Sequence, residues 1–200
     1  MTITRRSCVA ALLLPALQAV GSDPTFASNF DGTRLLDQEG HPFAAARLAG
    51  KTTLYNFVFT GCSTVCPVQT RVLADVLRRL GPDVRDRVHF VSVSLDPLTD
   101  SPAVLKAYAR AQDVDLKHWS FVTGRPADID RVAERLRLFK ADAGARRPDD
   151  HATSLWLADR EGRLRQRYPG NPPDAARLVA ELTQLDTLTR DPPTRRASGG

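Results

Sequence analysis

TTLYNFVFTGCSTVCP, residues 52–67, joins a strand pattern directly to a helix start. Its first eight residues, 52–59, are rich in β-branched and aromatic side chains, which is typical of a buried central strand. Pro67 fits the first turn of a helix, where its missing N–H costs nothing. Apolar residues then recur at helical spacing until Gly81-Pro82 ends the pattern. The sequence therefore predicts a strand that passes through a short cysteine-containing turn into a helix.

The rest of the chain repeats this alternation of strands and helices. Further strands are predicted at 33–36, 42–43, 88–95, 119–122, 154–158 and 164–168, and further helices at 102–108, 129–136 and 175–188. A chain of 200 residues with 42% hydrophobic content can bury one sizeable core. We therefore expect one α/β domain, with a central mixed sheet covered by helices on both faces.

The N-terminal segment has the pattern of an export signal. Arg5 and Arg6 precede an apolar run over residues 8–20, and small residues follow at a spacing that suits cleavage. Because such a run is too short to cross a bilayer of ~30 Å, we expect a signal peptide over residues 1–21. A buried N-terminal helix and an uncleaved anchor remain alternatives. Export would place the protein in the periplasm or at the outer face of the inner membrane.

The remaining boundaries follow from composition. We expect a folded domain over residues 22–189, which opens with a short polar lead-in, and a disordered tail over residues 190–200. The formal net charge is +5, but much of this excess comes from arginines in the two terminal segments. The chain has no basic stripe with interleaved aromatic residues, so we expect no nucleic acid partner.

Cysteine usage points to the chemistry. Of the three cysteines, Cys8 falls inside the predicted signal, which leaves Cys62 and Cys66. In an oxidising compartment such a pair can be a disulfide, a redox couple or a metal site. A helix N-terminus lowers the pKa of a thiol, and a spacing of four places both sulfurs on one side of the first turn. Two thiols do not complete a zinc site, so a metal site would need a further ligand.

His151 is the candidate third ligand. It comes directly before the predicted strand at 154–158. In a thioredoxin-like sheet, the loop that enters this strand lies beside the loop that carries the cysteines. A histidine in an exposed surface loop is the alternative interpretation.

Three separated motifs, in this order and spacing, resemble the SCO/SenC family. They are Cys62-Ser-Thr-Val-Cys66-Pro67, then Ser94-Leu95-Asp96-Pro97, and then Asp150-His151. The resemblance covers roughly residues 30–188. Members often have Pro-Asp between the two cysteines, whereas this chain has Ser63-Thr64. This difference leaves both cysteines in place.

The resemblance implies a thioredoxin-like fold that binds one copper ion, as Cu(I) or Cu(II), through Cys62, Cys66 and His151. It also implies delivery of copper to the binuclear copper site of cytochrome c oxidase subunit II, or reduction of the cysteines of that site. Another copper acceptor and a thiol reductant protein are further expected partners. Two thiolates and an imidazole form a soft ligand set that suits Cu(I). Asp96 is expected to cap the next turn or to support the copper ligands from beside them.

A periplasmic thiol–disulfide oxidoreductase, with Cys62 and Cys66 as its redox couple, is the main alternative. Thioredoxin-type enzymes usually carry a proline just before the strand that faces the cysteines, and this chain has His151-Ala152-Thr153 there. A peroxide-reducing protein is disfavoured because the Thr-x-x-Cys pattern is missing. A thiol–disulfide role of Cys62 and Cys66 can coexist with copper binding, since a disulfide must be reduced before it can bind copper. Whether the protein is an enzyme thus stays open at this stage.

Overall fold

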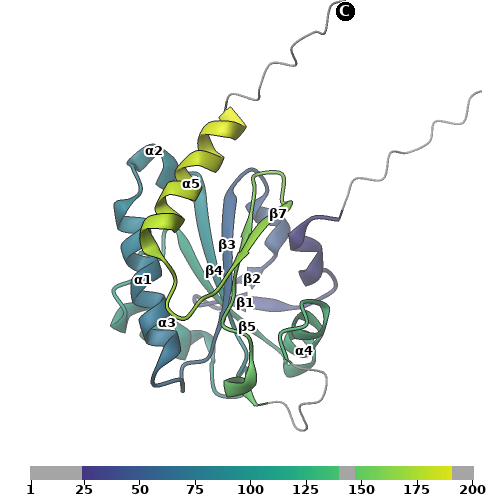
Figure 1. Cartoon of the computed structure of the whole chain (residues 1–200). Coiled ribbons are helices and arrows are strands. Elements are labelled where there is room, and N and C mark those ends of the chain that lie inside the picture. Colours follow the sequence, from purple (N-terminus) through teal and green to yellow (C-terminus); the bar gives the residue numbers. More distant parts are fainter. Residues whose placement is uncertain (1–23, 140–146, 191–200) are drawn as a thin grey trace, which may run out of the picture.

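The computed structural model describes residues 24–139 and 147–190 (Figure 1). In chain order the elements are η1 (Phe26–Phe30), β1 (Leu35–Asp37), β2 (Pro42–Phe43), η2 (Ala45–Leu48), β3 (Thr52–Val58), α1 (Val65–Arg79), α2 (Pro82–Arg85), β4 (Val88–Ser94), α3 (Pro102–Ala111), β5 (Trp119–Gly124), α4 (Pro126–Arg135), η3 (Pro148–Asp150), β6 (Leu155–Ala158), β7 (Leu164–Tyr168) and α5 (Ala175–Arg190). The elements marked η are short 3₁₀ helices. The predicted strands and long helices are confirmed, with small shifts at their ends.

Within the described residues, seven strands form one mixed sheet in the order β2-β1-β5-β4-β3-β6-β7. The central strands β3, β4 and β5 are parallel, and Thr52 of β3 lies opposite Val88 of β4. On the two sides of this parallel centre, β1 pairs with β5 and β6 pairs with β3, both in antiparallel orientation. The prediction of a central mixed sheet is therefore confirmed.

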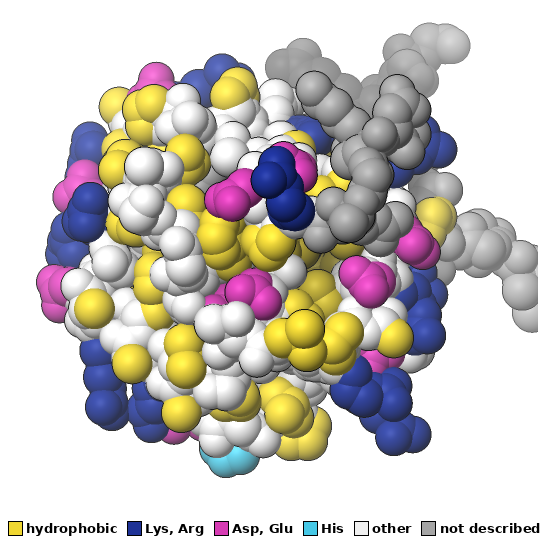
Figure 2. All heavy atoms as spheres, turned by 90° about the horizontal axis from the view of Figure 1, so that it is seen from below, with side chains coloured by type: hydrophobic (Ala, Val, Ile, Leu, Met, Phe, Trp, Pro, Cys, Tyr) yellow, Lys and Arg dark blue, Asp and Glu magenta, His cyan; other side chains and the backbone are white. Residues whose placement is uncertain are grey.

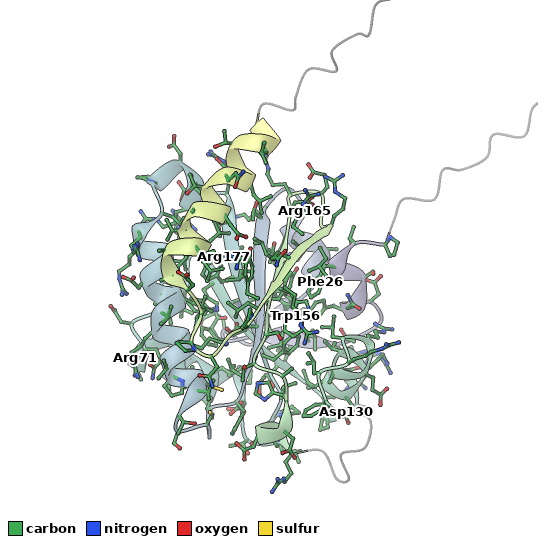
Figure 3. All side chains as sticks on the ribbon, in the orientation of Figure 1. Phe26, Arg71, Asp130, Trp156, Arg165 and Arg177 are labelled. Carbon is green, nitrogen blue, oxygen red and sulfur yellow. The ribbon has the colours of Figure 1, made fainter. Side chains whose placement is uncertain are left out.

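Helices cover both faces of the sheet. The first core cluster joins Leu73 of α1, Leu105 of α3 and Leu178 of α5 to one face. The second cluster packs η1 and α4 on the other face, where Phe26 and Trp156 lie (Figures 1 and 3). All residues of β3 and β4 are buried, because a strand covered on both faces has no solvent-facing side.

The segment before β1 is more ordered than the sequence suggested. Residues 26–30 form η1, and the rings of Phe26 and Phe30 pack on Tyr55 with centroids 4.6 and 5.5 Å away. The Phe26 N–H also donates to the carbonyl of Gly162 at 2.6 Å. The prediction of a short polar lead-in was wrong, because two phenylalanines in a polar segment are enough to attach it to the core.

No helix among residues 24–139 and 147–190 is long and apolar enough to cross a membrane. The predicted signal, residues 1–21, lies outside the described residues. So does nearly all of the predicted tail, residues 190–200. The domain boundaries therefore stay predictions.

Candidate metal centre

Cys62 and Cys66 meet in the turn between β3 and α1. The N–H of Cys66 donates to the Cys62 sulfur at 3.4 Å, and both residues are free thiols. Cys62 is half-buried, whereas Cys66 is 2% exposed and packs with Phe59 and Val58. The structure thus brings the two predicted sulfur ligands together, one partly exposed and one buried.

The two thiols differ in acidity. Partial burial by itself raises the pKa of Cys62, but backbone N–H groups of Cys66, Thr64 and Val65 point at its sulfur and outweigh the burial. The pKa of Cys62 therefore falls below its ordinary value, as expected at a helix N-terminus. Burial, together with the adjacent Cys62 sulfur, raises the pKa of Cys66 to about 12. Cys62 is consequently the thiol that ionises first.

A buried carboxylate for which the sequence predicted no role holds the loop in front of Cys62. Asp100 is fully buried, and it accepts hydrogen bonds from the Thr60 N–H at 3.1 Å and the Thr60 hydroxyl at 2.5 Å. The Ser94 hydroxyl donates to the same carboxylate at 2.5 Å. A signal was present in the sequence, since Asp100 stands in the Asp-Ser-Pro run that precedes the helix at Pro102.

Asp96 lies in the turn before α3 and interacts there through its backbone. Its carbonyl accepts from the Asp100 N–H at 2.8 Å, while the cap of α3 is the Ser101 hydroxyl, which accepts from the Val104 N–H. Within the described ranges the Asp96 carboxylate has no hydrogen-bond partner. Asp96 thus closes the turn before α3 through its carbonyl and not through its carboxylate, and its supporting role beside the ligands stays a prediction.

His151 follows η3 and is 9% exposed, so the exposed surface-loop alternative does not hold. Its Nε2 lies 3.1 Å from the carbonyl oxygen of Phe57, and its Nδ1 lies 2.5 Å from that of Pro148. A neutral imidazole carries one N–H and can donate to one of these oxygens at a time.

Phe59 links the three predicted ligands. It packs against Cys66, and its ring meets the His151 ring edge to face at a centroid distance of 6.3 Å. In the part of the chain that the structure describes, no group of three His, Cys, Asp or Glu residues stands ready to hold a metal ion. His151 is thus near the cysteines without being in ligating position. The donor set suits copper chemically, but the imidazole has to leave the Phe57 carbonyl to reach the sulfurs.

The end of the molecule that carries the cysteine turn has exposed hydrophobic side chains. Leu98 is 85% exposed in the loop after β4, and Val68 is 40% exposed two residues after Cys66. Figure 2 looks onto this end and shows hydrophobic side chains interspersed with polar ones, with Asp and Glu among them and most Lys and Arg toward the margin. Exposed apolar side chains such as Leu98 are available for contact with another protein.

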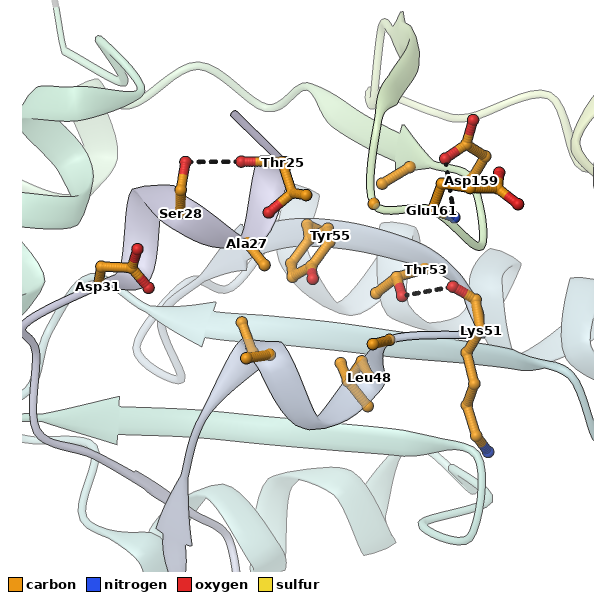
Figure 4. A pocket seen from close by; sticks show the side chains of 15 residues that line it. Thr25, Ala27, Ser28, Asp31, Leu48, Lys51, Thr53, Tyr55, Asp159 and Glu161 are labelled. Atoms are coloured by element: carbon orange, nitrogen blue, oxygen red, sulfur yellow. Dashed lines mark hydrogen bonds between the residues drawn. The ribbon is translucent and has the colours of Figure 1, made fainter. Parts of the chain in front are cut away.

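A separate cavity of about 310 Å³ lies between η1, η2 and β3 (Figure 4). Tyr55, Leu48 and Lys51 are among its lining residues, and none of the three predicted ligands is. The cavity is therefore not part of the candidate metal centre.

A thioredoxin-like domain with two thiols at a strand-to-helix turn, and an imidazole close behind them, defines the class of the protein. Residues 22–186 match the family model of SCO1/SenC, and the chain belongs to this family. It is 31% identical to the SCO1 protein homolog of Bacillus subtilis (strain 168) over 159 residues, which are 76% of this chain and 80% of the relative.

Solved structures show the same fold. The structure of Bradyrhizobium japonicum ScoI with copper bound has a TM-score of 0.65 and 31% identity, and the match covers 76% of this chain and 96% of that one. BsSco, described as a member of the Sco family of cytochrome c oxidase assembly proteins with a disulfide switch, has a TM-score of 0.64 and 25% identity. That match covers 78% of this chain and 91% of BsSco. The thioredoxin-like fold is thereby confirmed.

Proposed function

We propose that this protein is a copper chaperone that binds one copper ion through Cys62, Cys66 and His151 and delivers it to a partner protein. The observation that carries the proposal is the meeting of two thiols at the β3–α1 turn, with a buried imidazole on the other side of Phe59. Copper bound to the related ScoI supports the same cargo here. Two thiolates hold Cu(I), and the imidazole keeps Cu(II) accessible.

The difference in pKa between the two thiols fits an order in which the ligands bind the ion. Cys62 is the more exposed of the two thiols and has the lowered pKa, so it offers the first thiolate. Cys66 gives up its proton when the metal binds, since a coordinating thiol is deprotonated. His151 completes the ligand set once it leaves the carbonyl of Phe57.

The acceptor that fits best is the binuclear copper site of cytochrome c oxidase subunit II, with another copper acceptor as the broader possibility. BsSco belongs to a family of oxidase assembly proteins, which supports this choice. The exposed hydrophobic side chains of Leu98 and Val68 offer a surface on which such a partner docks. A thiol reductant protein is the second expected partner, because Cys62 and Cys66 must be reduced before copper binds.

A thiol–disulfide oxidoreductase is the second candidate function, and the paired sulfurs favour it. Oxidation of the two thiols to a disulfide releases two protons and passes two electrons to an acceptor disulfide, which becomes two thiols. The disulfide switch described for BsSco supports redox activity of this kind. Reduction of the acceptor's cysteines and delivery of copper are compatible steps at one site.

We also propose that residues 1–21 export the protein to the periplasm or the outer face of the inner membrane. A SCO1/SenC family lipoprotein from Bacillus anthracis, with 29% identity and a TM-score of 0.65, supports a location at the membrane surface. The folded unit then spans residues 22–189, and residues 190–200 form a tail outside it.

The test compares His151→Ala with wild type. Both proteins are reduced anaerobically, loaded with one equivalent of Cu(II), and examined by visible spectroscopy; reduction of their Cys62–Cys66 disulfide by a common thiol is measured separately. The variant should lose the thiolate-to-copper absorption, while its disulfide chemistry should stay within about twofold of wild type. His41→Ala, at an exposed histidine, is the matched control and should behave as wild type.

Identical copper spectra for wild type and His151→Ala would contradict the proposed ligand set. The oxidoreductase function would then be the better explanation. Cys62→Ala and Cys66→Ala should each abolish tight Cu(I) binding, and an unchanged stoichiometry in both would indicate adventitious sites.

A further inference from the structure

A buried amide joins the cysteine helix to the segment that carries His151. Gln69 is 2% exposed on α1, one turn after Cys66. Its Nε2 donates to the carbonyl of Thr153 at 3.0 Å and to that of Gly170 at 2.7 Å. Its Oε1 accepts from the Asn56 amide of β3 at 2.7 Å. One side chain thus bonds to three segments that lie far apart in the sequence.

The orientation of this amide is dictated by the groups at the two ends of a buried chain of hydrogen bonds. At one end the Trp119 indole, which is a donor, bonds to the Ser92 hydroxyl at 2.9 Å. Ser92 therefore donates onward to the Asn56 oxygen at 2.6 Å, and Asn56 donates to Gln69. At the other end the two carbonyls are acceptors, so the Gln69 NH₂ group must face them.

At Gly170, the backbone lies too close to Thr153 and Gln69 for a side chain to fit. A Cβ added to Gly170 would lie 1.6 Å from the Thr153 oxygen and 2.3 Å from the Gln69 nitrogen. Thr153 stands two residues after His151, and the N–H of Ala152 is held by the carbonyl of Leu138 at 2.9 Å. The backbone just after His151 is therefore fixed to α1, while the imidazole itself lies against the carbonyls of Pro148 and Phe57.

We propose that Gln69 is a positioning residue of the copper site: it fixes the His151 segment to the cysteine helix, so that the imidazole can exchange the Phe57 carbonyl for the metal without displacement of its backbone. This inference rests on the proposed function. Partners that orient a metal-binding histidine, when removed, typically lower metal affinity 10–100-fold. Gln69 acts on the backbone of that histidine, so we expect a loss of about tenfold.

The experiment uses Gln69→Leu, with Gln69→Met as a second variant of similar length that also lacks the amide. Ser92→Ala is the matched control, because it breaks the same chain of hydrogen bonds at its far end and leaves both carbonyl contacts of Gln69 in place. Unfolding by urea ranks the stability of all variants. The His151 ring signals in metal-free protein are recorded by ¹⁵N NMR, and Cu(II) affinity and visible spectra are then measured.

Gln69→Leu should shift the His151 ring signals and weaken Cu(II) binding about tenfold. Ser92→Ala should lower the stability to a comparable degree but should change neither the ring signals nor the Cu(II) affinity. In a His151→Ala background, Gln69→Leu should have no further effect on Cu(II) affinity, since it acts through that imidazole. An effect that persists there, unchanged ring signals, or failure of both Gln69 variants to fold would overturn the positioning role. Absence of a copper spectrum in wild type would contradict the proposed function, and the metal-free ring signals would still decide the role of Gln69.

Discussion

Cys62 and Cys66 are four residues apart, yet their surroundings give them opposite acid–base behaviour. Helix N–H groups lower the pKa of Cys62, while burial raises that of Cys66 to about 12. Because the thiolate is the nucleophile, a lowered pKa moves reactivity to lower pH. We expect iodoacetamide to modify Cys62 first near neutral pH, with a half-maximal rate at a lower pH than an ordinary thiol shows. Peptide mapping by mass spectrometry over a pH series measures this.

Cys62→Ser is the control for that prediction. The remaining thiol of Cys66 should react slowly in the folded protein until the pH approaches its raised pKa. Equal rates for the two cysteines in the wild type, or faster modification of Cys66, would contradict the predicted difference between their pKa values.

Only some of the site residues could be predicted from the sequence. Cys62, Cys66 and His151 stand in short motifs that can be read along the chain. Asp100 and Gln69 do not, because their partners lie 40 residues away at Thr60 and 84 residues away at Thr153. A role was predicted only for Asp96, in the Ser-Leu-Asp-Pro motif, whereas the carboxylate that the fold buries and surrounds with donors is that of Asp100.

The predictable elements are those with a strong local pattern. β3 and β4 are rich in β-branched and aromatic residues, and α3 has both a serine cap and a proline at its start. η1 and the four-residue α2 were missed, because their order depends on contacts outside the segment. The order of the strands in the sheet was also not predicted, since pairing joins residues that are distant in sequence.

The connection from β7 to α5 gives a test at the level of elements. Gly170→Ala should lower the free energy of unfolding by about 1–3 kcal/mol or more, because the added Cβ would overlap the Thr153 carbonyl. Gly81→Ala is the matched control: its φ is −57°, a Cβ there meets nothing within 4 Å, and a change of about 1 kcal/mol or less is expected from the opposed effects of a poorer helix cap and a less flexible unfolded chain. Urea unfolding of both variants measures the difference. Equal stability of the two would mean that the close approach at Gly170 relaxes at little cost.

Across the whole molecule, the sheet separates two apolar cores and places the candidate site at the end of β3. In an open sheet with a parallel centre, loops beyond the carboxyl ends of the strands are the usual place for function. The cysteine turn follows β3 and the Asp100 loop follows β4, and the two are joined there by the bonds to Thr60. At this end, exposed hydrophobic side chains lie among polar and charged ones (Figure 2).

The position of η1 limits where an export signal can be removed. Cleavage after Phe26 would separate the chain from a ring that packs on Tyr55 and from a hydrogen bond to Gly162, and loss of a buried Phe side chain typically costs about 3–5 kcal/mol. We therefore expect the mature chain to begin near Ser22 and before Phe26, so that η1 stays on the core. Intact-mass analysis and N-terminal sequencing of protein from the native host measure the start. A start beyond Phe30, or a full-length product in the cytosol, would contradict both the predicted signal and the oxidising environment in which the two thiols are proposed to work.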